Sequence, residues 1–468
     1  MQKLQNSKTK INNTFIRTNF KQIFEVKLNI NQTREFHRLI YEIQRSSNLS
    51  FAAITDKIKL NSKINHIRAK NKISLIKDIL IELRFPITNL KQKISPKDVF
   101  LPIIKPSPKE THPVQEFKPL KIFVDQKASK SDLTNKFRTK FPEIEIQEFK
   151  NYQQYLNKNK FSMQDLKKPF IFITEQDWDF IKPCPCTKYH LRCNYWIFNL
   201  GFGCPFDCSY CFLQQYANFP GIILPANLTD FFTNFDKFFK KINRPIRIGT
   251  GEFCDSLALD YITDYSTQVI NFFRDKPVLF ELKTKSNKID NLLKISPSKN
   301  IIISWSLNPQ SIISKEELCT VSLEQRIDAA KKVSQHGYAL SFHFDPIFYS
   351  HNWEVLYKDV IKKLYIELSP PFKWISLGTL RGMRKLKTVS EQRFPKSNIF
   401  YGELFLAEDK KLRYPKFLRK EIYQKMLKWI REYDTQTPVY LCMEDQDVWS
   451  VMDKKFSCSA QIEKYLIG

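Results

Sequence analysis

Apolar runs and amphipathic stretches alternate along the second half of the chain. Six runs of apolar and β-branched residues, bounded by turn residues, predict buried strands: they cover residues 195–200, 246–253, 278–285, 301–308, 338–347 and 373–380. Apolar residues at helical spacing follow four of them, at 261–274, 289–293, 323–335 and 353–368. Helical crossovers between strands are typical of parallel sheets. The pattern therefore predicts an α/β fold, with a partial (β/α)6 barrel over residues 191–385.

The flanking segments differ from this pattern. Residues 1–115 predict a mostly helical, basic leader, with amphipathic stretches at 32–46 and 71–83 and a proline-rich linker at 102–119. Residues 116–190 predict a small α/β subdomain, with strands at 120–125, 144–149 and 169–174 and a helix at 131–140. Residues 386–468 predict an extension that packs on the barrel, with an irregular basic loop, a helix at 415–432 and a strand at 438–445.

Composition bears on the partners and the location of the protein. The 468 residues carry a formal net charge of +27, which favours polyanionic partners such as nucleic acid. The same excess also fits a lysine-rich composition with solvated basic faces. Apolar runs stay short of the ~18 residues that a membrane span requires, and the basic N-terminus lacks the apolar segment of a signal peptide. Ten cysteines without a secretion signal indicate reduced thiols, so we expect a cytoplasmic protein, and a monomer.

One loop concentrates the candidate chemistry. Cys204, Cys208 and Cys211 follow the first barrel strand with the spacing C-x3-C-x2-C. Three thiolates on one loop can hold three irons of a [4Fe-4S] cluster and leave the fourth iron open. Two other interpretations remain: buried free thiols, or a zinc site. Three further cysteines lie just upstream in the sequence and would take part in a zinc site: Cys184, Cys186 and Cys193.

Polar residues follow the predicted strands at their carboxyl ends, where barrels of this type bind ligands. The second strand ends in a glycine-containing turn with Gly251 and Glu252, and glycine lets a backbone approach a ligand closely. The other candidates for ligand contacts are Asp255, Ser256, Lys285, Ser306, Asn308 and Asp345. Strand-end capping or a solvated position would explain several of them equally well.

The cysteine spacing, with Tyr210 before the last cysteine, resembles the radical S-adenosylmethionine (SAM) enzymes. A narrower resemblance, to the spore photoproduct lyase family, covers about residues 117–449. It depends on the motifs CPFDCSYCFLQQY, GTGEFCDSLALD, LKTKSN, SWSLNP, SLEQRIDAAKKV, GYALSFHFDPI and ISLGTLR. The resemblance implies a radical SAM barrel, a [4Fe-4S] cluster and SAM as cofactors, and a 5′-deoxyadenosyl radical that abstracts hydrogen. It further implies repair of a thymine dimer in ultraviolet-damaged DNA.

The resemblance also implies roles for single residues. Glu252 would contact the SAM amino group, Lys285 the carboxylate, and Ser306 and Asn308 the ribose hydroxyls. Cys254, 43 positions after Cys211, falls near the hydrogen-donating cysteine of the family. Tyr210 matches one member of its tyrosine pair, but the residue after Cys211 is a phenylalanine, which has no hydroxyl to relay hydrogen.

Partners and rival functions remain open at this stage. The resemblance implies DNA and a reducing electron donor, such as a flavodoxin or ferredoxin, as partners, without a membrane. A radical SAM enzyme acting on a nucleotide, RNA or peptide is one alternative. A non-catalytic nucleic-acid-binding protein with a structural metal site is another. The sequence does not identify the role of the leader or of the three upstream cysteines.

Overall fold

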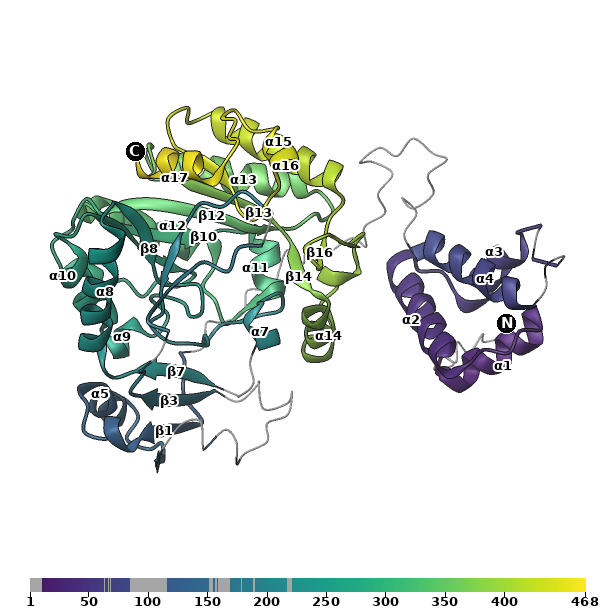
Figure 1. Ribbon diagram of the computed structural model, residues 1–468, viewed down its shortest axis with the longest axis horizontal. Helices are drawn as coiled ribbons and strands as arrows, with labels where there is room; N and C mark the ends of the chain where they lie inside the picture. The colour runs from purple at the N-terminus through teal and green to yellow at the C-terminus, as the bar shows by residue number, and fades with distance from the viewer. Residues whose placement is uncertain are drawn as a thin grey trace, which may run out of the picture. The chain divides into compact units, whose positions relative to one another are not determined.

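The chain forms two compact units. The structure, a computed structural model, describes residues 11–84 except 63, 66 and 68, residues 116–150, 155 and 158, and residues 169–468 except 178, 188, 189 and 217–220. The N-terminal unit comprises the described part of residues 1–104 together with 398–404, and the barrel unit holds the remainder (Figure 1). Most of the expected linker at 102–119 lies outside the described residues. Among the described residues, no helix is both long and apolar enough to cross a membrane.

The N-terminal unit is helical, as the leader pattern predicts. Its helices are α1 (Asn13–Phe24), α2 (Ile30–Ser47), α3 (Phe51–Lys59) and α4 (Ala69–Arg84). Side chains such as Phe20, Phe36 and Ile76 are fully buried between them. A short turn from far along the chain, η6 (Ile399–Tyr401), belongs to the same unit. The Arg84 side chain there pairs with Glu42 at 2.9 Å and also reaches the carbonyl oxygen of Gly402 at 3.4 Å.

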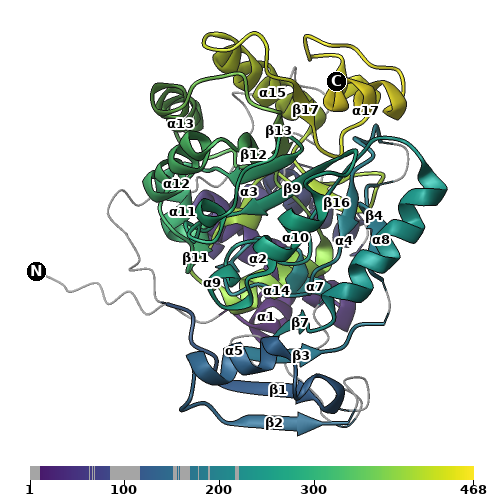
Figure 2. The same ribbon diagram turned by 90° about the vertical axis from the view of Figure 1, so that its left-hand side faces the viewer.

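An eight-stranded sheet forms the barrel unit's centre. Its order is β17-β13-β12-β10-β9-β8-β5-β4, and the six predicted strands lie consecutively and in parallel within it (Figure 2). They are β5 (Trp196–Phe198), β8 (Ile246–Gly249), β9 (Val278–Thr284), β10 (Ile301–Ser306), β12 (Ala339–Ile347) and β13 (Ile375–Thr379). The helices between them are α8 (Leu228–Ile242), α9 (Asp260–Thr263), α10 (Tyr265–Phe273), α11 (Gln310–Glu316), α12 (Leu323–His336) and α13 (Trp353–Glu367). The curled sheet confirms the partial barrel.

The two edges of this sheet carry one further strand each. β4 (Ile181–Pro183) pairs antiparallel with β5, and β17 (Val439–Leu441) pairs parallel with β13. The segment that follows β4 then crosses to the opposite edge, where Leu191 bridges to Glu444 just after β17. The open side of the partial barrel is therefore bridged by backbone hydrogen bonding, and the C-terminal extension is part of the barrel wall.

A smaller parallel sheet confirms the predicted α/β subdomain. Its order is β2-β1-β3-β7. The strands are β1 (Lys121–Asp125), β2 (Ile146–Phe149), β3 (Phe170–Thr174) and β7 (Ile222–Pro225), with α5 (Asp132–Lys140) and the turn η3 (Gln126–Ala128) beside them. The cysteine loop follows β5 of the eight-stranded sheet, and the chain after this loop continues into β7 of the smaller sheet. The loop therefore lies on the connection between the two sheets.

Some local expectations differ from the structure. The stretch at 289–293 forms a 3-10 turn, η5 (Leu292–Lys294), rather than a helix. The basic segment after the sixth strand is ordered rather than irregular, as β14 (Arg381–Met383) followed by α14 (Arg384–Arg393). β14 joins β16 (Lys411–Arg413) and β15 (Phe405–Leu406) in a three-stranded antiparallel sheet. The remaining elements are β6 (Asp207–Cys208), α7 (Leu213–Tyr216), β11 (Glu317–Leu318), α15 (Lys416–Arg431), α16 (Gln446–Trp449) and α17 (Ser459–Ile467).

Candidate active site

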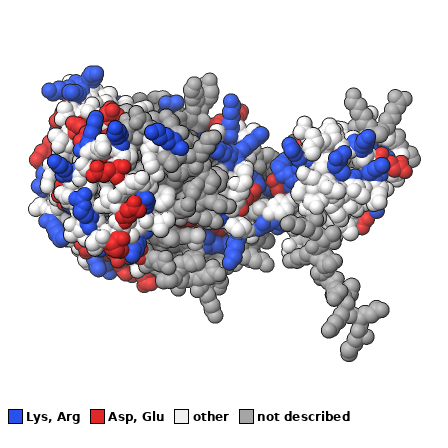
Figure 3. All heavy atoms as spheres, turned by 90° about the horizontal axis from the view of Figure 1, so that it is seen from below, with Lys and Arg blue, Asp and Glu red and all other residues white. Residues whose placement is uncertain are grey.

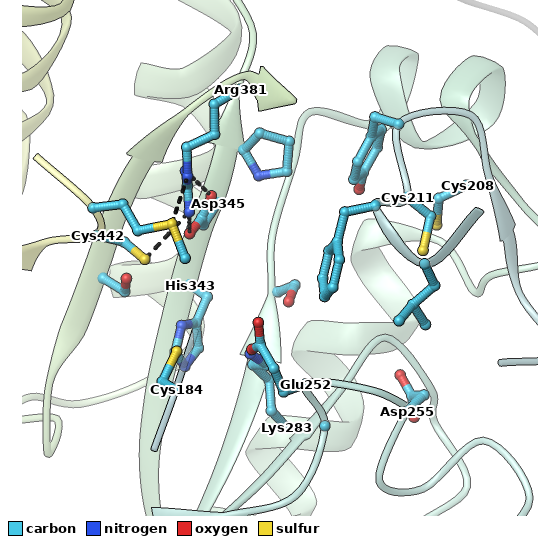
Figure 4. A pocket seen from close by; sticks show the side chains of 18 of the residues that line it. Cys184, Cys208, Cys211, Glu252, Asp255, Lys283, His343, Asp345, Arg381 and Cys442 are labelled. Carbon is cyan, nitrogen blue, oxygen red and sulfur yellow. Dashed lines mark hydrogen bonds and ion pairs between the residues drawn. The ribbon is translucent and has the colours of Figure 1, made fainter. Parts of the chain in front are cut away.

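A cavity of about 280 Å³ lies at the carboxyl ends of the barrel strands. Most of the residues expected at the site line it: Cys204, Cys208, Cys211, Tyr210, Gly251, Glu252, Cys254, Asp255, Lys285, Ser306 and Asp345. In Figure 4, Cys208 and Cys211 lie on one side of the cavity and Cys442 and Cys184 on the other, with Glu252 and Lys283 between them. The cavity does not include Ser256 or Asn308.

The cysteine loop is held by short backbone contacts. Cys208 lies in β6, which pairs antiparallel with β11, and the Cys211 N–H donates to the carbonyl oxygen of Cys208 at 3.1 Å. The Gly203 N–H donates to the carbonyl oxygen of Phe253 at 2.8 Å, which ties this loop to the loop after β8. Burial raises the pKa of the Cys204, Cys208 and Cys211 thiols. Burial therefore opposes loss of the proton from each of these three sulfurs.

Glu252 and Lys283 form an ion pair within the cavity, with 3.2 Å between Oε2 and Nζ. Burial alone would lower the pKa of Lys283, but Glu252 and Glu281 outweigh it and raise that pKa. Gly251 precedes this pair with a φ of +91°, and a Cβ there would lie 2.7 Å from the carbonyl oxygen of Lys283. Only glycine fits this turn without strain, and its absent side chain lets the backbone approach β9.

The Asp255 carboxylate organises the loop that follows. It accepts hydrogen bonds from the N–H groups of Leu257, Ala258 and Lys285 and from the Thr284 hydroxyl. Burial raises the pKa of Asp255, although these hydrogen bonds oppose the shift. Ser256 behaves similarly, since its hydroxyl accepts from the Lys283 N–H at 2.9 Å. Both residues connect the β8 and β9 loops, and Asp255 also reaches the cavity.

A buried network positions Tyr210. Its hydroxyl donates to Glu317, which also accepts from the Asn308 amide at 2.7 Å and pairs with Arg326 at 2.6 Å. Burial would raise the pKa of Glu317, but Arg326 and Lys285 outweigh burial and lower it to about 2. The Asn308 oxygen accepts from the Tyr357 hydroxyl at 2.8 Å. The structure thus places Asn308 behind Tyr210, with both ends of its amide bonded to protein.

Comparisons with known proteins identify the family of this chain. A family model described as spore photoproduct lyase matches residues 117–437, well over half of the chain. The chain belongs to the spore photoproduct lyase family. The spore photoproduct lyase of Bacillus subtilis is 25% identical over 322 residues, which cover 66% of this chain and 91% of that protein. The lyase of a Geobacillus species is 28% identical over 214 residues, covering 44% of this chain and 62% of that protein.

Solved structures of the family share the fold. A doubly substituted spore photoproduct lyase with bound AdoMet and dinucleoside spore photoproduct superposes with a TM-score of 0.61 at 23% identity. A lyase complexed with dinucleoside spore photoproduct gives a TM-score of 0.60 at 22% identity. Each match covers 70% of this chain and 100% of the solved chain. Family membership makes this chain an enzyme of the radical SAM lyase type.

Cys254 and Phe212 also line the cavity of this member of the spore photoproduct lyase family. Cys254 lines the cavity and its thiol donates to the carbonyl oxygen of Leu200 at 3.4 Å. Burial raises the pKa of this thiol to about 12. Phe212 lines the cavity next to Cys211 and packs edge-on against Phe253, with ring centroids 6.4 Å apart.

The structure adds cavity residues that the sequence patterns did not single out. Lys283 lies in β9, two positions before Lys285, which directly follows the end of this strand, and both residues line the cavity. His343 lines the cavity and bonds to Glu281 at 2.7 Å. Arg381 forms a bidentate pair with Asp345, at 2.8 and 2.9 Å. Both carboxylate oxygens of Asp345 therefore already accept hydrogen bonds from the protein.

Proposed function

We propose that this chain repairs a thymine photoproduct in DNA, with a [4Fe-4S] cluster and SAM as cofactors. The supporting observation is that Cys204, Cys208 and Cys211 share one cavity with Glu252 and Cys254. A cluster-binding triad, a carboxylate for the cofactor and a thiol for the product therefore face the same space. Family membership supports the same assignment.

The donor set fits an iron–sulfur cluster better than a single metal ion. Within the described residues, no three Cys, His, Asp or Glu side chains are arranged as ligands of one ion, whereas cysteines on separate irons of a cluster need not converge so closely. Cys204, Cys208 and Cys211 would each hold one iron. When bound, the reduced cluster supplies the electron that splits SAM and starts hydrogen-atom abstraction.

Residues at the strand ends would hold SAM. Glu252 would accept hydrogen bonds from its ammonium group, and Lys283 pairs with that carboxylate at 3.2 Å. Lys285, directly after the end of β9, would offer a cation for the SAM carboxylate. Ser306 presents its hydroxyl to the cavity while its carbonyl oxygen accepts from Arg326 at 2.9 Å. Gly251 leaves room for the ligand.

Cys254 is our candidate for the hydrogen donor to the product. A donor must keep its S–H hydrogen, and burial raises the pKa of this thiol to about 12, so it stays protonated at neutral pH. Tyr210 lines the cavity with its hydroxyl bound to Glu317. Phe212 cannot pass on a hydrogen atom, so a relay through a tyrosine pair is incomplete in this chain.

The proposed substrate is DNA with a thymine lesion. Chemistry on a base requires that the base leave the stack, so the lesion would be extruded toward the cavity. The net charge of +27 favours DNA over neutral partners. Basic and acidic side chains are interspersed on the face drawn in Figure 3, so the support for DNA lies in the net charge and not in a separate basic patch on the described part of this face. A flavodoxin or ferredoxin is the proposed electron donor.

The test is an anaerobic assay of reconstituted protein on ultraviolet-irradiated DNA that contains spore photoproduct. We expect SAM-dependent loss of the lesion with recovery of thymine. Cys254→Ala should retain SAM cleavage but yield altered products, because the product radical lacks its donor. The exposed Cys458 provides a matched control, and Cys458→Ala should repair normally. SAM cleavage without lesion loss in the unmodified protein would contradict DNA repair and favour another substrate, to which Phe212 also points.

A further inference from the structure

Four cysteines outside the proposed mechanism converge where the two edges of the barrel meet. Cys184 and Cys186 directly follow β4, Cys193 precedes β5, and Cys442 directly follows β17 at the opposite edge. The Leu191–Glu444 bridge joins these edges. Cys184, Cys193 and Cys442 line the same cavity as the cysteine loop, and Figure 4 shows Cys184 and Cys442 on the side opposite Cys208 and Cys211. We call these four residues the seam cysteines.

The seam cysteines lie within interaction range of one another. A tight backbone turn, in which the Cys186 N–H donates to the carbonyl oxygen of Cys184 at 2.7 Å, brings these two side chains together, and their thiols are hydrogen-bonded. Cys193 lies within electrostatic range of both. Cys442 lies within the same range of Cys186 and Cys193. Each thiol therefore has at least two others as neighbours, although the four come from three separate segments.

Arg247 lies beside the seam cysteines, and its guanidinium group is only partly hydrogen-bonded. Its side chain is fully buried, and two of its nitrogens, Nε and Nη1, find no hydrogen-bond acceptor among the described residues. Aromatic rings surround the guanidinium, the nearest being Trp374 at 4.0 Å, and Cys193 lies within electrostatic range. Glu281 is also within electrostatic range of Arg247, but its Oε1 bonds to His343, Ser304, Ser341 and Trp374. A buried cation is costly unless an anion accompanies it.

Other cations face the same thiols. The Arg381 Nη2 donates to the Cys442 sulfur at 3.3 Å, and Arg192 and Arg381 are both within electrostatic range of Cys186. Glu252 opposes them from the cavity side. Deprotonated sulfurs holding a metal group would add negative charge beside Arg247, whose Nε and Nη1 have no acceptor among the described residues, whereas Arg381 is already paired with Asp345.

We propose that Cys184, Cys186, Cys193 and Cys442 bind a second [4Fe-4S] cluster. Thiolates are the preferred ligands of iron–sulfur clusters. A single zinc ion fits less well, since no three candidate ligands in the described part of the chain are arranged around one ion. Four cysteines saturate all four irons, so this cluster, unlike one on the cysteine loop, has no open position for SAM. The proposal does not depend on the DNA substrate or on the first cluster.

The experiment counts metal in protein reconstituted anaerobically with iron and sulfide. Full-length protein should hold about eight irons per chain, as expected for two four-iron clusters. The variant with Cys204, Cys208 and Cys211 all changed to Ala should keep about half of this iron. The electron paramagnetic resonance signal of its reduced form should not change on addition of SAM, because no iron is open. Cys458→Ala, at an exposed cysteine far along the chain, should retain the full iron content.

Changing the four seam cysteines to Ala should also remove about half of the iron, and should leave the SAM-responsive signal. Circular dichroism shows whether each variant is folded. About four irons per chain in the unmodified protein that all remain when the four seam cysteines are changed to Ala would overturn the proposal. One zinc per chain that resists exchange for iron, or loss of all iron from the variant lacking the cysteine-loop ligands, would overturn it as well.

Discussion

The buried pair of Arg326 and Glu317 allows a quantitative test. Both side chains are fully buried, and their closest atoms are 2.6 Å apart. Arg326→Met removes the cation and leaves the carboxylate buried without its main partner. The pKa of Glu317 is lowered from 4.5 to about 2, and at ~1.4 kcal/mol per pKa unit this corresponds to about 3 kcal/mol of folding free energy. Breaking a buried pair costs roughly 3–5 kcal/mol, so the two figures agree.

The sign of the pH dependence follows from the same shift. Because the folded-state pKa of Glu317 is lowered, its contribution to stability is present above pH 4.5 and is lost as the pH falls toward 2. In Arg326→Met, burial raises the pKa of Glu317 instead. The deficit of the variant relative to the unmodified protein should therefore be largest at neutral pH and should shrink as the pH is lowered through 4.5.

Urea unfolding followed by tryptophan fluorescence measures this difference. All seven tryptophans lie outside the N-terminal unit, so the signal reports on the barrel unit alone. Lys331→Met, which breaks a partly exposed pair with Glu367, is the control and should cost less than ~1 kcal/mol. Adding Glu317→Gln to Arg326→Met should restore part of the lost stability. A loss below ~1 kcal/mol for Arg326→Met, or no restoration in the double variant, would refute the reasoning.

Three further predictions concern the cavity. Gly251→Ala should weaken SAM binding by at least tenfold in equilibrium titration, because the new Cβ would lie 2.7 Å from the carbonyl oxygen of Lys283; Gly337→Ala, at a helix end with φ +109°, should leave SAM binding unchanged. Lys283→Met should also weaken SAM binding, because the Glu252 carboxylate loses the partner that holds it at 3.2 Å, and unchanged affinity would contradict the cofactor role of Glu252. Hydrogen donation by Cys254, whose pKa burial raises to about 12, should show no decline in product yield between pH 6 and pH 9, as followed by chromatography.

The barrel strands are predictable from the chain because their signals are local. Runs such as Ile301–Ser306 are entirely buried in the sheet, and an uninterrupted apolar run reports burial on both faces. The cysteine loop and the turn at Gly251 are likewise compact motifs. Lys283 could also have been predicted as a cavity residue, because residues two apart on a strand share a face and Lys285 was already a candidate. The sequence patterns indicated Lys285 alone.

Other parts of the site depend on contacts between distant segments. Nothing near Cys442 in the sequence indicates that β17 pairs with β13 or that Leu191 bridges to Glu444. The arrangement of Asn308 behind Tyr210 follows from Glu317, which binds both. Such placements are set by the register of the sheet and by burial of charge, which only the folded chain reveals.

The turn at residues 399–401 has a consequence for how this protein can be shortened or can have arisen. It lies inside the stretch that matches the family, yet it packs with the helices of the leader; Tyr401 is 2% exposed there, and its ring lies 6.5 Å from that of Tyr41. A chain that starts after residue 104 would leave this turn without its apolar surroundings. The leader helices and this turn therefore depend on each other. Gain or loss of the leader during evolution would require substitutions in the turn some three hundred residues downstream, where the Gly402 carbonyl oxygen accepts a hydrogen bond from Arg84.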